Sequence, residues 1–309
     1  MGPARSACSG PQKNSSPSAN ADRGFARTSS YWNLRESPFL NVDNEALLYP
    51  SPQLQEGVAR LYYLIDQERT AGMVTGPYGV GKTYLLSCLV RRSKSLNLPL
   101  IRFDAIPDGS LPMARHILQR LDIKGDTPTL ADALMLMRTR CIETDRRPLS
   151  RHILLIDEAQ YLTEKDGLYL VHFLCNLTVE SGKGHQKNLF TTILAGTPQL
   201  AESVRNYESL QRRIQLSWAL TPLSEAQTIE YVQHHMRSAG GDTWSFTLDS
   251  LKAVHAYSGG VPRNINNLCD TALMLGFAGR VQAITPEIIH EAAIDTCLAP
   301  APSAKTENA

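Results

Sequence analysis

Long apolar runs are missing from this 309-residue chain, and no stretch approaches the roughly 18 consecutive apolar residues of a membrane span. The first residues also lack the apolar segment of a secretory signal peptide. The six cysteines include no Cys-x-x-Cys pair, which argues against a disulfide framework and suits a reducing compartment. We therefore expect a cytoplasmic protein without a transmembrane segment.

An excess of one charge is missing as well. The chain has 31 basic and 30 acidic residues, so its composition gives no general argument for binding nucleic acid or a membrane surface. The eight histidines are dispersed and indicate no zinc site, and the adjacent pair His234-His235 is expected at the surface of a helix. Apolar residues make up 42%, which is ordinary for a globular protein with a substantial core.

The pattern of apolar residues divides the chain into four parts. Residues 1–30 and 298–309 are poor in apolar residues and are predicted to be disordered tails. In residues 31–220, apolar strands alternate with helices. The strands are expected near 71–76, 99–104, 152–157, 189–196 and 214–220. Because the run His152–Ile156 is continuously apolar, it is typical of a central parallel strand covered on both faces. Residues 31–220 are thus predicted to be an α/β domain with helices flanking a parallel sheet.

After Thr221-Pro222 the pattern changes to helices without strands. These helices are predicted at 224–238, 247–257, 262–278 and 285–295. Glycines provide the breaks between them, and Thr285-Pro286 has the pattern of a helix start. A small all-α domain over residues 221–297 is therefore expected to follow the α/β domain.

The strongest motif is Gly76-Pro-Tyr-Gly-Val-Gly-Lys-Thr83, which matches the phosphate-binding pattern G-x-x-x-x-G-K-[ST] in full. It follows the apolar strand and opens a helical run, as that pattern requires. Its glycines let the backbone N–H groups point at phosphate oxygens, while Lys82 can reach the β- and γ-phosphates and Thr83 can bind Mg²⁺. The expected ATP-binding residues are Gly76, Pro77, Tyr78, Gly79, Val80, Gly81, Lys82, Thr83 and Tyr84.

A second motif, Asp157-Glu158, ends a buried strand and delivers two carboxylates to the edge where parallel sheets bind ligands. In nucleotide hydrolases with this kind of loop, the first carboxylate holds the Mg²⁺ shell, and the second can orient and polarise the attacking water. The alternative is an acidic strand end that only caps a helix. Following a complete phosphate-binding motif, the catalytic interpretation is favoured.

Four further residues are candidates on weaker patterns. Thr197 follows an apolar strand and could hydrogen-bond the γ-phosphate or the attacking water, although a Thr before Pro can be a plain turn residue. Arg212 and Arg213 could reach the ATP site of a neighbouring subunit, or simply form a solvated basic turn. Arg263 opens a helix, where a cation opposes the helix dipole, and this placement hints at an anionic ligand.

Several blocks together resemble the AAA+ ATPase superfamily, and more narrowly the ExeA/GspA (general secretion pathway protein A) family. The similar blocks are Tyr31–Phe39, Tyr49–Pro52, Leu61–Ile65, Asp157–Gln160, Phe173–Leu177, Ala195–Leu200 and Ser258–Asp270. By position, the resemblance implies that Lys82 and Thr83 belong to the Walker A motif and that Asp157 and Glu158 form the Walker B motif. It also implies that Thr197 is the sensor 1 residue and Arg263 the sensor 2 residue. Arg212 or Arg213 would be the arginine finger that acts on a neighbouring subunit. Members of that family usually continue into a membrane span and a peptidoglycan-binding domain, and neither is expected in this sequence. The resemblance therefore carries over the ATPase chemistry, whereas the secretion role does not follow from it.

Three hypotheses remain open at this point. The first is a Mg²⁺-dependent ATPase that drives conformational change or assembly, as a homo-oligomer with shared ATP sites and a protein partner in a secretion or cell-wall complex. The second is an ATP-dependent, DNA-binding regulator of the kind that accompanies a transposase. The third is a nucleotide-gated switch with negligible turnover, which Glu158 disfavours because a pure binder has no evident need for a water-activating carboxylate.

Overall fold

The computed structural model describes residues 28–41, 47–95, 97–107, 109–143, 149–163, 166–181 and 185–298. Of the two predicted tails, residues 1–27 and 299–309 lie outside these ranges. Residues 28–31 form one helical turn.

Five parallel strands form the central sheet, in the order β2-β3-β6-β1-β7. The strands are β1 (Ala71–Thr75), β2 (Leu100–Asp104), β3 (His152–Asp157), β6 (Phe190–Gly196) and β7 (Ile214–Ala219). Their bounds differ from the predicted ones by no more than one residue at either end. The predicted α/β class with a parallel sheet flanked by helices is confirmed.

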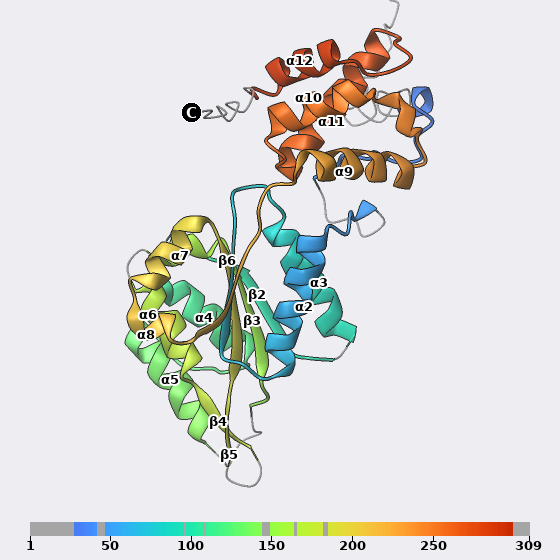
Figure 1. Cartoon of the computed structure of the whole chain (residues 1–309). Helices are drawn as coiled ribbons and strands as arrows, with labels where there is room; N and C mark the ends of the chain where they lie inside the picture. Colours follow the sequence, from blue (N-terminus) through green and yellow to red (C-terminus); the bar gives the residue numbers. More distant parts are fainter. Residues whose placement is uncertain are drawn as a thin grey trace, which may run out of the picture.

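Helices cover both faces of the sheet (Figure 1). Two of them, α2 (Pro52–Asp66) and α3 (Lys82–Ser95), pack on one face. The other face is covered by α4 (Ser110–Arg120), α5 (Leu130–Ile142), α6 (Gly167–Cys175), α7 (Pro198–Arg205) and α8 (Glu208–Gln211). Successive side chains of a strand point to opposite faces, so Ile153 and Leu155 of β3 enter the first core and Leu154 and Ile156 the second. Burial on both sides explains why this strand is apolar without alternation.

An antiparallel hairpin, β4 (Thr178–Ser181) and β5 (His185–Asn188), was not predicted. It precedes β6 and extends beyond the end of the sheet (Figure 1). Its strands are short and mostly polar, so no run of alternating apolar residues marked them in the sequence. A short 3₁₀ helix, η2 (Ala159–Thr163), follows β3.

A helical lid lies over one edge of the sheet, and its helices α9 (Glu225–Ser238), α10 (Leu248–Ser258), α11 (Pro262–Ala278) and α12 (Pro286–Asp295) match the four predicted helices. A 3₁₀ helix, η3 (Thr243–Ser245), lies between the first two. The lid has its own apolar cluster, separate from the two clusters on the sheet faces. Ser224 and Gln227 form a capping box that begins α9.

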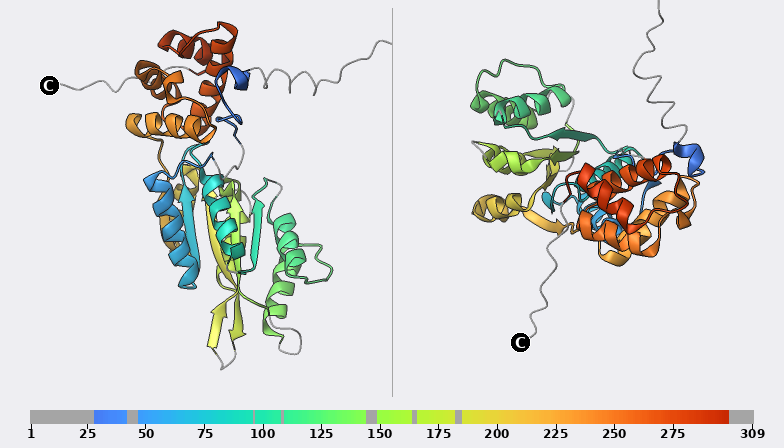
Figure 2. Two further views of the ribbon diagram at one scale, coloured as in Figure 1. Left: turned by 90° about the vertical axis from the view of Figure 1, so that its right-hand side faces the viewer. Right: turned by 90° about the horizontal axis from the view of Figure 1, so that it is seen from above.

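The segment of residues 28–41, which we call the N-terminal strap, packs against the lid and not against the sheet (Figure 2). Trp32 is 4% exposed, and its Nε1 donates to the carbonyl oxygen of Leu273 at 2.9 Å. Phe39 stacks on His235, and Tyr31 donates to the carbonyl oxygen of Val281. No sequence pattern indicated that this segment contacts helices more than 190 residues later in the chain.

Replacing Trp32 by Ala is expected to lower the free energy of unfolding by about 3–5 kcal/mol, because it removes a buried aromatic ring and a satisfied hydrogen bond. Trp244→Ala is the matched control, since that ring is 82% exposed and its loss should change stability by less than about 0.5 kcal/mol. Urea denaturation followed by circular dichroism measures both. Equal midpoints for the two variants would show that the strap contributes nothing to the stability of the lid.

Candidate functional site

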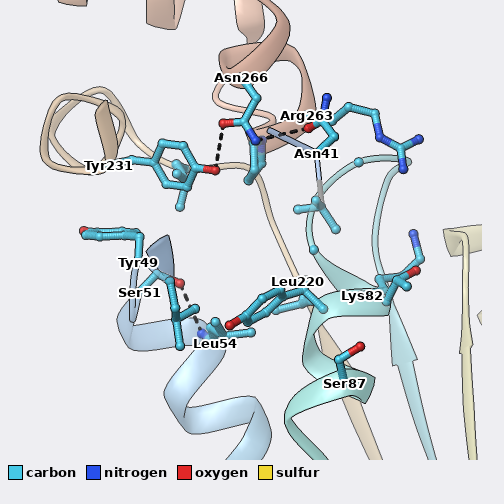
Figure 3. Close-up of a pocket in the computed structure, with 18 of the residues that line it drawn as sticks. Asn41, Tyr49, Ser51, Leu54, Lys82, Ser87, Leu220, Tyr231, Arg263 and Asn266 are labelled. Atoms are coloured by element: carbon cyan, nitrogen blue, oxygen red, sulfur yellow. Dashed lines mark hydrogen bonds between the residues drawn. The ribbon is translucent and has the colours of Figure 1, made fainter. Parts of the chain in front are cut away.

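A cavity of about 270 Å³ lies between the sheet edge and the lid (Figure 3). The sheet side of its lining consists of the loop and helix start after β1, together with Glu158 after β3. The rest of the lining comes from the strap, the segment that leads into α2, the segment between β7 and α9, and the lid helices α9 and α11. All strands of the sheet are parallel, so the loops that follow their carboxyl ends meet at this one edge.

The loop between β1 and α3 has the conformation that its glycines were expected to allow. Gly79 and Gly81 have φ values of +77° and +107°, which residues with a Cβ atom rarely adopt. A Cβ atom on Gly79 would also lie 2.8 Å from Cβ of Arg263. The loop and the lid therefore approach each other closely at Gly79, where a side chain would not fit.

Lys82, the first residue of α3, directly follows this loop and is 5% exposed. Its Nζ donates to the carbonyl oxygens of Gly76 and Pro77, at 2.8 and 2.9 Å. Burial lowers the pKa of the Lys82 ammonium, and Arg263 acts in the same direction, whereas Glu158 and Asp157 oppose the shift. Two carbonyl acceptors and two nearby carboxylates thus hold a buried cation beside the cavity.

Asp157 and Glu158 lie at the end of β3. Asp157 is 2% exposed, its Oδ1 accepts the N–H of Glu158 at 3.0 Å, and its Oδ2 is paired with Arg102 at 3.4 Å. Arg102 also donates to Ser87 of α3, at 3.1 Å. The sequence analysis missed Arg102, although a lone arginine inside the apolar strand β2 could have indicated a buried acidic partner. Glu158 lines the cavity directly, while Asp157 does not.

Arg263 is in the first turn of α11, and its backbone N–H donates to the carbonyl oxygen of Gly79 at 3.3 Å. Figure 3 shows its guanidinium group on the same side of the cavity as the Lys82 ammonium. Two cations and the starts of α3 and α11 therefore converge on one region. Such a region favours an anionic group, because backbone N–H groups at a helix start carry a partial positive charge.

Like Asp157, the predicted site residues Gly76 and Pro77 are not part of the cavity lining, and three others, Thr197, Arg212 and Arg213, are also outside it. Thr197 is buried at the start of α7, where its backbone N–H donates to Oε1 of Gln160. Arg212 and Arg213 directly precede β7, whose first residue pairs with Ala71 at the start of β1. They lie at the opposite edge of the sheet from the phosphate-binding loop, across the five residues of β1, or roughly 16 Å. Both are exposed, and Arg212 is ion-paired with Glu208.

The lid side of the cavity contains polar residues that the sequence analysis missed. Tyr231 donates to Oδ1 of Asn266 at 2.9 Å, and Nδ2 of Asn266 donates to Oδ1 of Asn41 at 3.1 Å (Figure 3). His235 was expected at the surface, but it is buried against the strap. Its Nδ1 lies 2.7 Å from the carbonyl oxygen of Pro38, and burial lowers its pKa to about 4. His235 is therefore neutral near pH 7, with the proton on Nδ1 and Nε2 left as an acceptor.

The predicted donors for a divalent cation are the Thr83 hydroxyl and the Asp157 carboxylate. Mg²⁺ is usually held by one or two carboxylates together with phosphate oxygens and water, and this set fits that pattern. Within the part of the chain that the structure describes, no group of three or more His, Cys, Asp and Glu side chains could hold a metal ion. Phosphate oxygens and water would complete such a site.

The comparisons with known proteins agree with this geometry. Residues 65–204 match the family model of the AAA domain. Over 251 residues it is 29% identical to General secretion pathway protein A of Aeromonas hydrophila. That match covers 80% of this chain and 44% of the relative, so the chain spans less than half of the relative's length. The predicted resemblance to AAA+ ATPases of the ExeA/GspA type is confirmed.

Solved structures share the fold at low sequence identity. Drosophila ORC bound to DNA has a TM-score of 0.64 and 17% identity, covering 96% of this chain and 71% of that chain. The Cdc6p protein of Pyrobaculum aerophilum has a TM-score of 0.62 and 15% identity, covering 84% and 70%. At such identities the likeness shows the fold alone.

Among the described residues, no helix combines the length and the apolar character needed to cross a bilayer.

Proposed function

We propose that this chain is a Mg²⁺-dependent ATPase that couples ATP binding and hydrolysis to conformational change or assembly of a larger complex. The observation that carries the proposal is the cavity itself, which is bounded by the phosphate-binding loop, by Glu158 and by Arg263 of the lid. Each of the three belongs to a different element, and an ATP molecule in the cavity would touch all of them.

The cavity has a cationic part that suits the phosphates of ATP and an apolar part that suits its base. Lys82 and the N–H groups of residues 79–83 would bind the β- and γ-phosphates, and Arg263 would add a second cation. Away from these cations, the lining includes the apolar side chains of Leu48, Leu54 and Leu223. We infer that the base occupies this apolar part, next to Tyr231 and Asn266.

Thr83 and Asp157 would hold Mg²⁺, which supplies charge neutralisation on the phosphates when it is bound. The Arg102 guanidinium lies 3.4 Å from Oδ2 of Asp157 and would hold the orientation of that carboxylate.

Glu158 would accept a proton from the attacking water. Its carboxylate lines the cavity, whereas the neighbouring Asp157 is turned into the protein, toward Arg102 and the Glu158 N–H. Two adjacent carboxylates therefore have different surroundings, which is what their two different roles require.

The lid provides the mechanical coupling. Arg263 joins α11 to the phosphate-binding loop through its backbone bond to Gly79. The strap ties the lid to the cavity, because Asn41 bonds both Asn266 and Asn267. A γ-phosphate bound by Lys82 and Arg263 together would favour the closed arrangement of lid and sheet, and its release would remove that preference.

Arg212 and Arg213 fit this scheme only as residues that act in a neighbouring subunit. They are exposed and far from the cavity of their own chain. We propose a homo-oligomer in which one of them enters the site of the next subunit, and a cytoplasmic location with a protein partner in a secretion or cell-wall complex. The alternative, a DNA-binding regulator, is not favoured, because only fold likeness at low identity points toward it.

The rate of ATP hydrolysis per subunit is expected to rise with protein concentration in the presence of Mg²⁺ and to vanish when EDTA removes the metal. Arg212→Ala combined with Arg213→Ala should lower that rate by about 10³-fold or more, as loss of an arginine finger does. Arg205→Ala, on the nearby helix α7, is the matched control and should retain the wild-type rate. A rate per subunit that is independent of concentration, together with normal turnover of the double variant, would contradict the shared site.

A further inference from the structure

We propose that Gln160 is a positioning residue that fixes the carboxylate of Glu158 for proton transfer and links it to β6 and to the phosphate-binding loop. This inference rests on the proposed function. Gln160 is in η2, two residues after Glu158, and is half-buried at the sheet edge. It does not line the cavity itself, so it would act through Glu158.

The Gln160 amide group joins three segments. Its Nε2 donates to Oε2 of Glu158 at 2.5 Å and to the hydroxyl oxygen of Tyr78 at 3.4 Å. Its Oε1 accepts the backbone N–H of Thr197 at 3.1 Å. These contacts connect the end of β3, the end of β6 and the loop after β1.

The orientation of this amide follows from the partners. The Thr197 N–H can only donate, so it must face the Gln160 oxygen. The NH₂ group then points toward the Glu158 carboxylate, which in its ionised form can only accept. A flipped amide would place donor against donor and acceptor against acceptor. The network therefore has one satisfied arrangement.

Gly196 provides the space for this arrangement. A Cβ atom at position 196 would lie 3.0 Å from Oε1 of Gln160 and 3.1 Å from its backbone nitrogen. These distances are shorter than ordinary van der Waals contacts. The absence of a side chain at Gly196, the last residue of β6, thus leaves room for the Gln160 amide close to the strand.

The backbone of Glu158 has an uncommon conformation, and hydrogen bonds hold the residue in place. It has φ of +50°, a left-handed conformation that is uncommon for a residue with a side chain. Its N–H is held by Asp157 and its carboxylate by Gln160, so the conformation is fixed from both ends. Without Gln160 the Glu158 carboxylate would lose the donor that holds its Oε2.

Two substitutions test the NH₂ group of Gln160, which donates to Glu158, separately from the rest of the side chain. Gln160→Glu keeps the shape and the acceptor for Thr197 but replaces the donor by an oxygen, while Gln160→Ala removes both. We expect either substitution to lower kcat by about 100-fold, the size of effect that displacement of a catalytic group produces. The KM for ATP and the binding of a fluorescent ATP analogue should change less than about twofold, because Gln160 does not line the cavity.

The decisive experiment is a double-mutant cycle between Gln160→Ala and Glu158→Gln, measured in the full chain with Gln119→Ala as an exposed control on α4. If Gln160 acts through Glu158, then Gln160→Ala should change the residual rate of Glu158→Gln by less than about twofold. An equal loss in both backgrounds, or an unchanged kcat for Gln160→Ala in the wild-type background, would overturn the proposal.

Urea unfolding of the same four proteins supplies a readout that does not depend on turnover. The two substitutions should be non-additive in their unfolding midpoints, because one contact is shared between them. Additive shifts would contradict the contact itself. A wild-type protein that binds the ATP analogue without hydrolysing it would overturn the proposed function, while non-additive midpoints would still support the Gln160–Glu158 link.

Discussion

Lys82→Ala is expected to abolish most ATP hydrolysis, lowering kcat/KM by at least about 100–1,000-fold. In the structure this ammonium is buried, and among the described residues that line the cavity Lys82 is the only lysine. Its removal takes away a preorganised cation from the place where the β- and γ-phosphates would bind. Steady-state phosphate release and titration with a fluorescent ATP analogue measure the loss of rate and the loss of affinity separately.

Lys94→Ala is the matched control for this variant. It changes the same residue type on the same helix, but in the last turn and at an exposed position. It should retain the wild-type rate. Because alanine at position 82 also leaves the carbonyl oxygens of Gly76 and Pro77 without their donor, circular dichroism must show that the variant is folded. A folded Lys82→Ala protein with wild-type turnover would contradict the assignment of this loop.

Glu158→Gln should separate binding from hydrolysis. The substitution keeps the shape of the side chain but removes the proton acceptor, so kcat is expected to fall by about 10²–10⁴-fold, as general bases contribute. ATP binding should be retained, since the loop, Lys82 and Arg263 are unchanged. Slow hydrolysis with retained binding should also lengthen the lifetime of any ATP-dependent oligomer, which size-exclusion chromatography with ATP would detect.

Glu202→Gln, an exposed change on α7, controls for the loss of one carboxylate. A variant at position 158 that turns over ATP as fast as this control would mean that another group accepts the proton. Loss of ATP binding in Glu158→Gln would instead mean that this carboxylate supports the cavity and does not take part in the chemistry.

The fold could be predicted closely because its signals are local. The continuous apolar run at His152–Ile156 identified a buried parallel strand, and the glycines and caps after residue 221 marked the lid helices within a residue or so. The β4–β5 hairpin gave no such signal, since its polar strands bury little. The packing of the strap on the lid also escaped prediction, because contacts such as Trp32 with Leu273 depend on long-range arrangement and leave no period in the sequence.

The residues of the candidate site likewise fall into those that local motifs predicted and those that depend on long-range contacts. The loop residues, Glu158 and Arg263 were chosen from motifs and from an unfavourable charge at a helix start, and the structure brings them to one cavity. Gln160 was part of a recognised block, but no role followed from its position, because its partner Thr197 is 37 residues away. Arg102 and Asn266 were missed for the same reason. Arg212 and Arg213 stay predictions, since a single chain cannot show a contact between subunits.

The most direct test of the central claim is multiple-turnover ATP hydrolysis by the wild-type chain and by Glu158→Gln, measured beside ATP binding in the same samples. The account predicts sustained phosphate release by the wild-type protein with Mg²⁺, and ATP binding with release at least about 100-fold slower in the variant. ATP binding without turnover in the wild-type protein would contradict it, and would leave a nucleotide-gated switch as the function of this cavity.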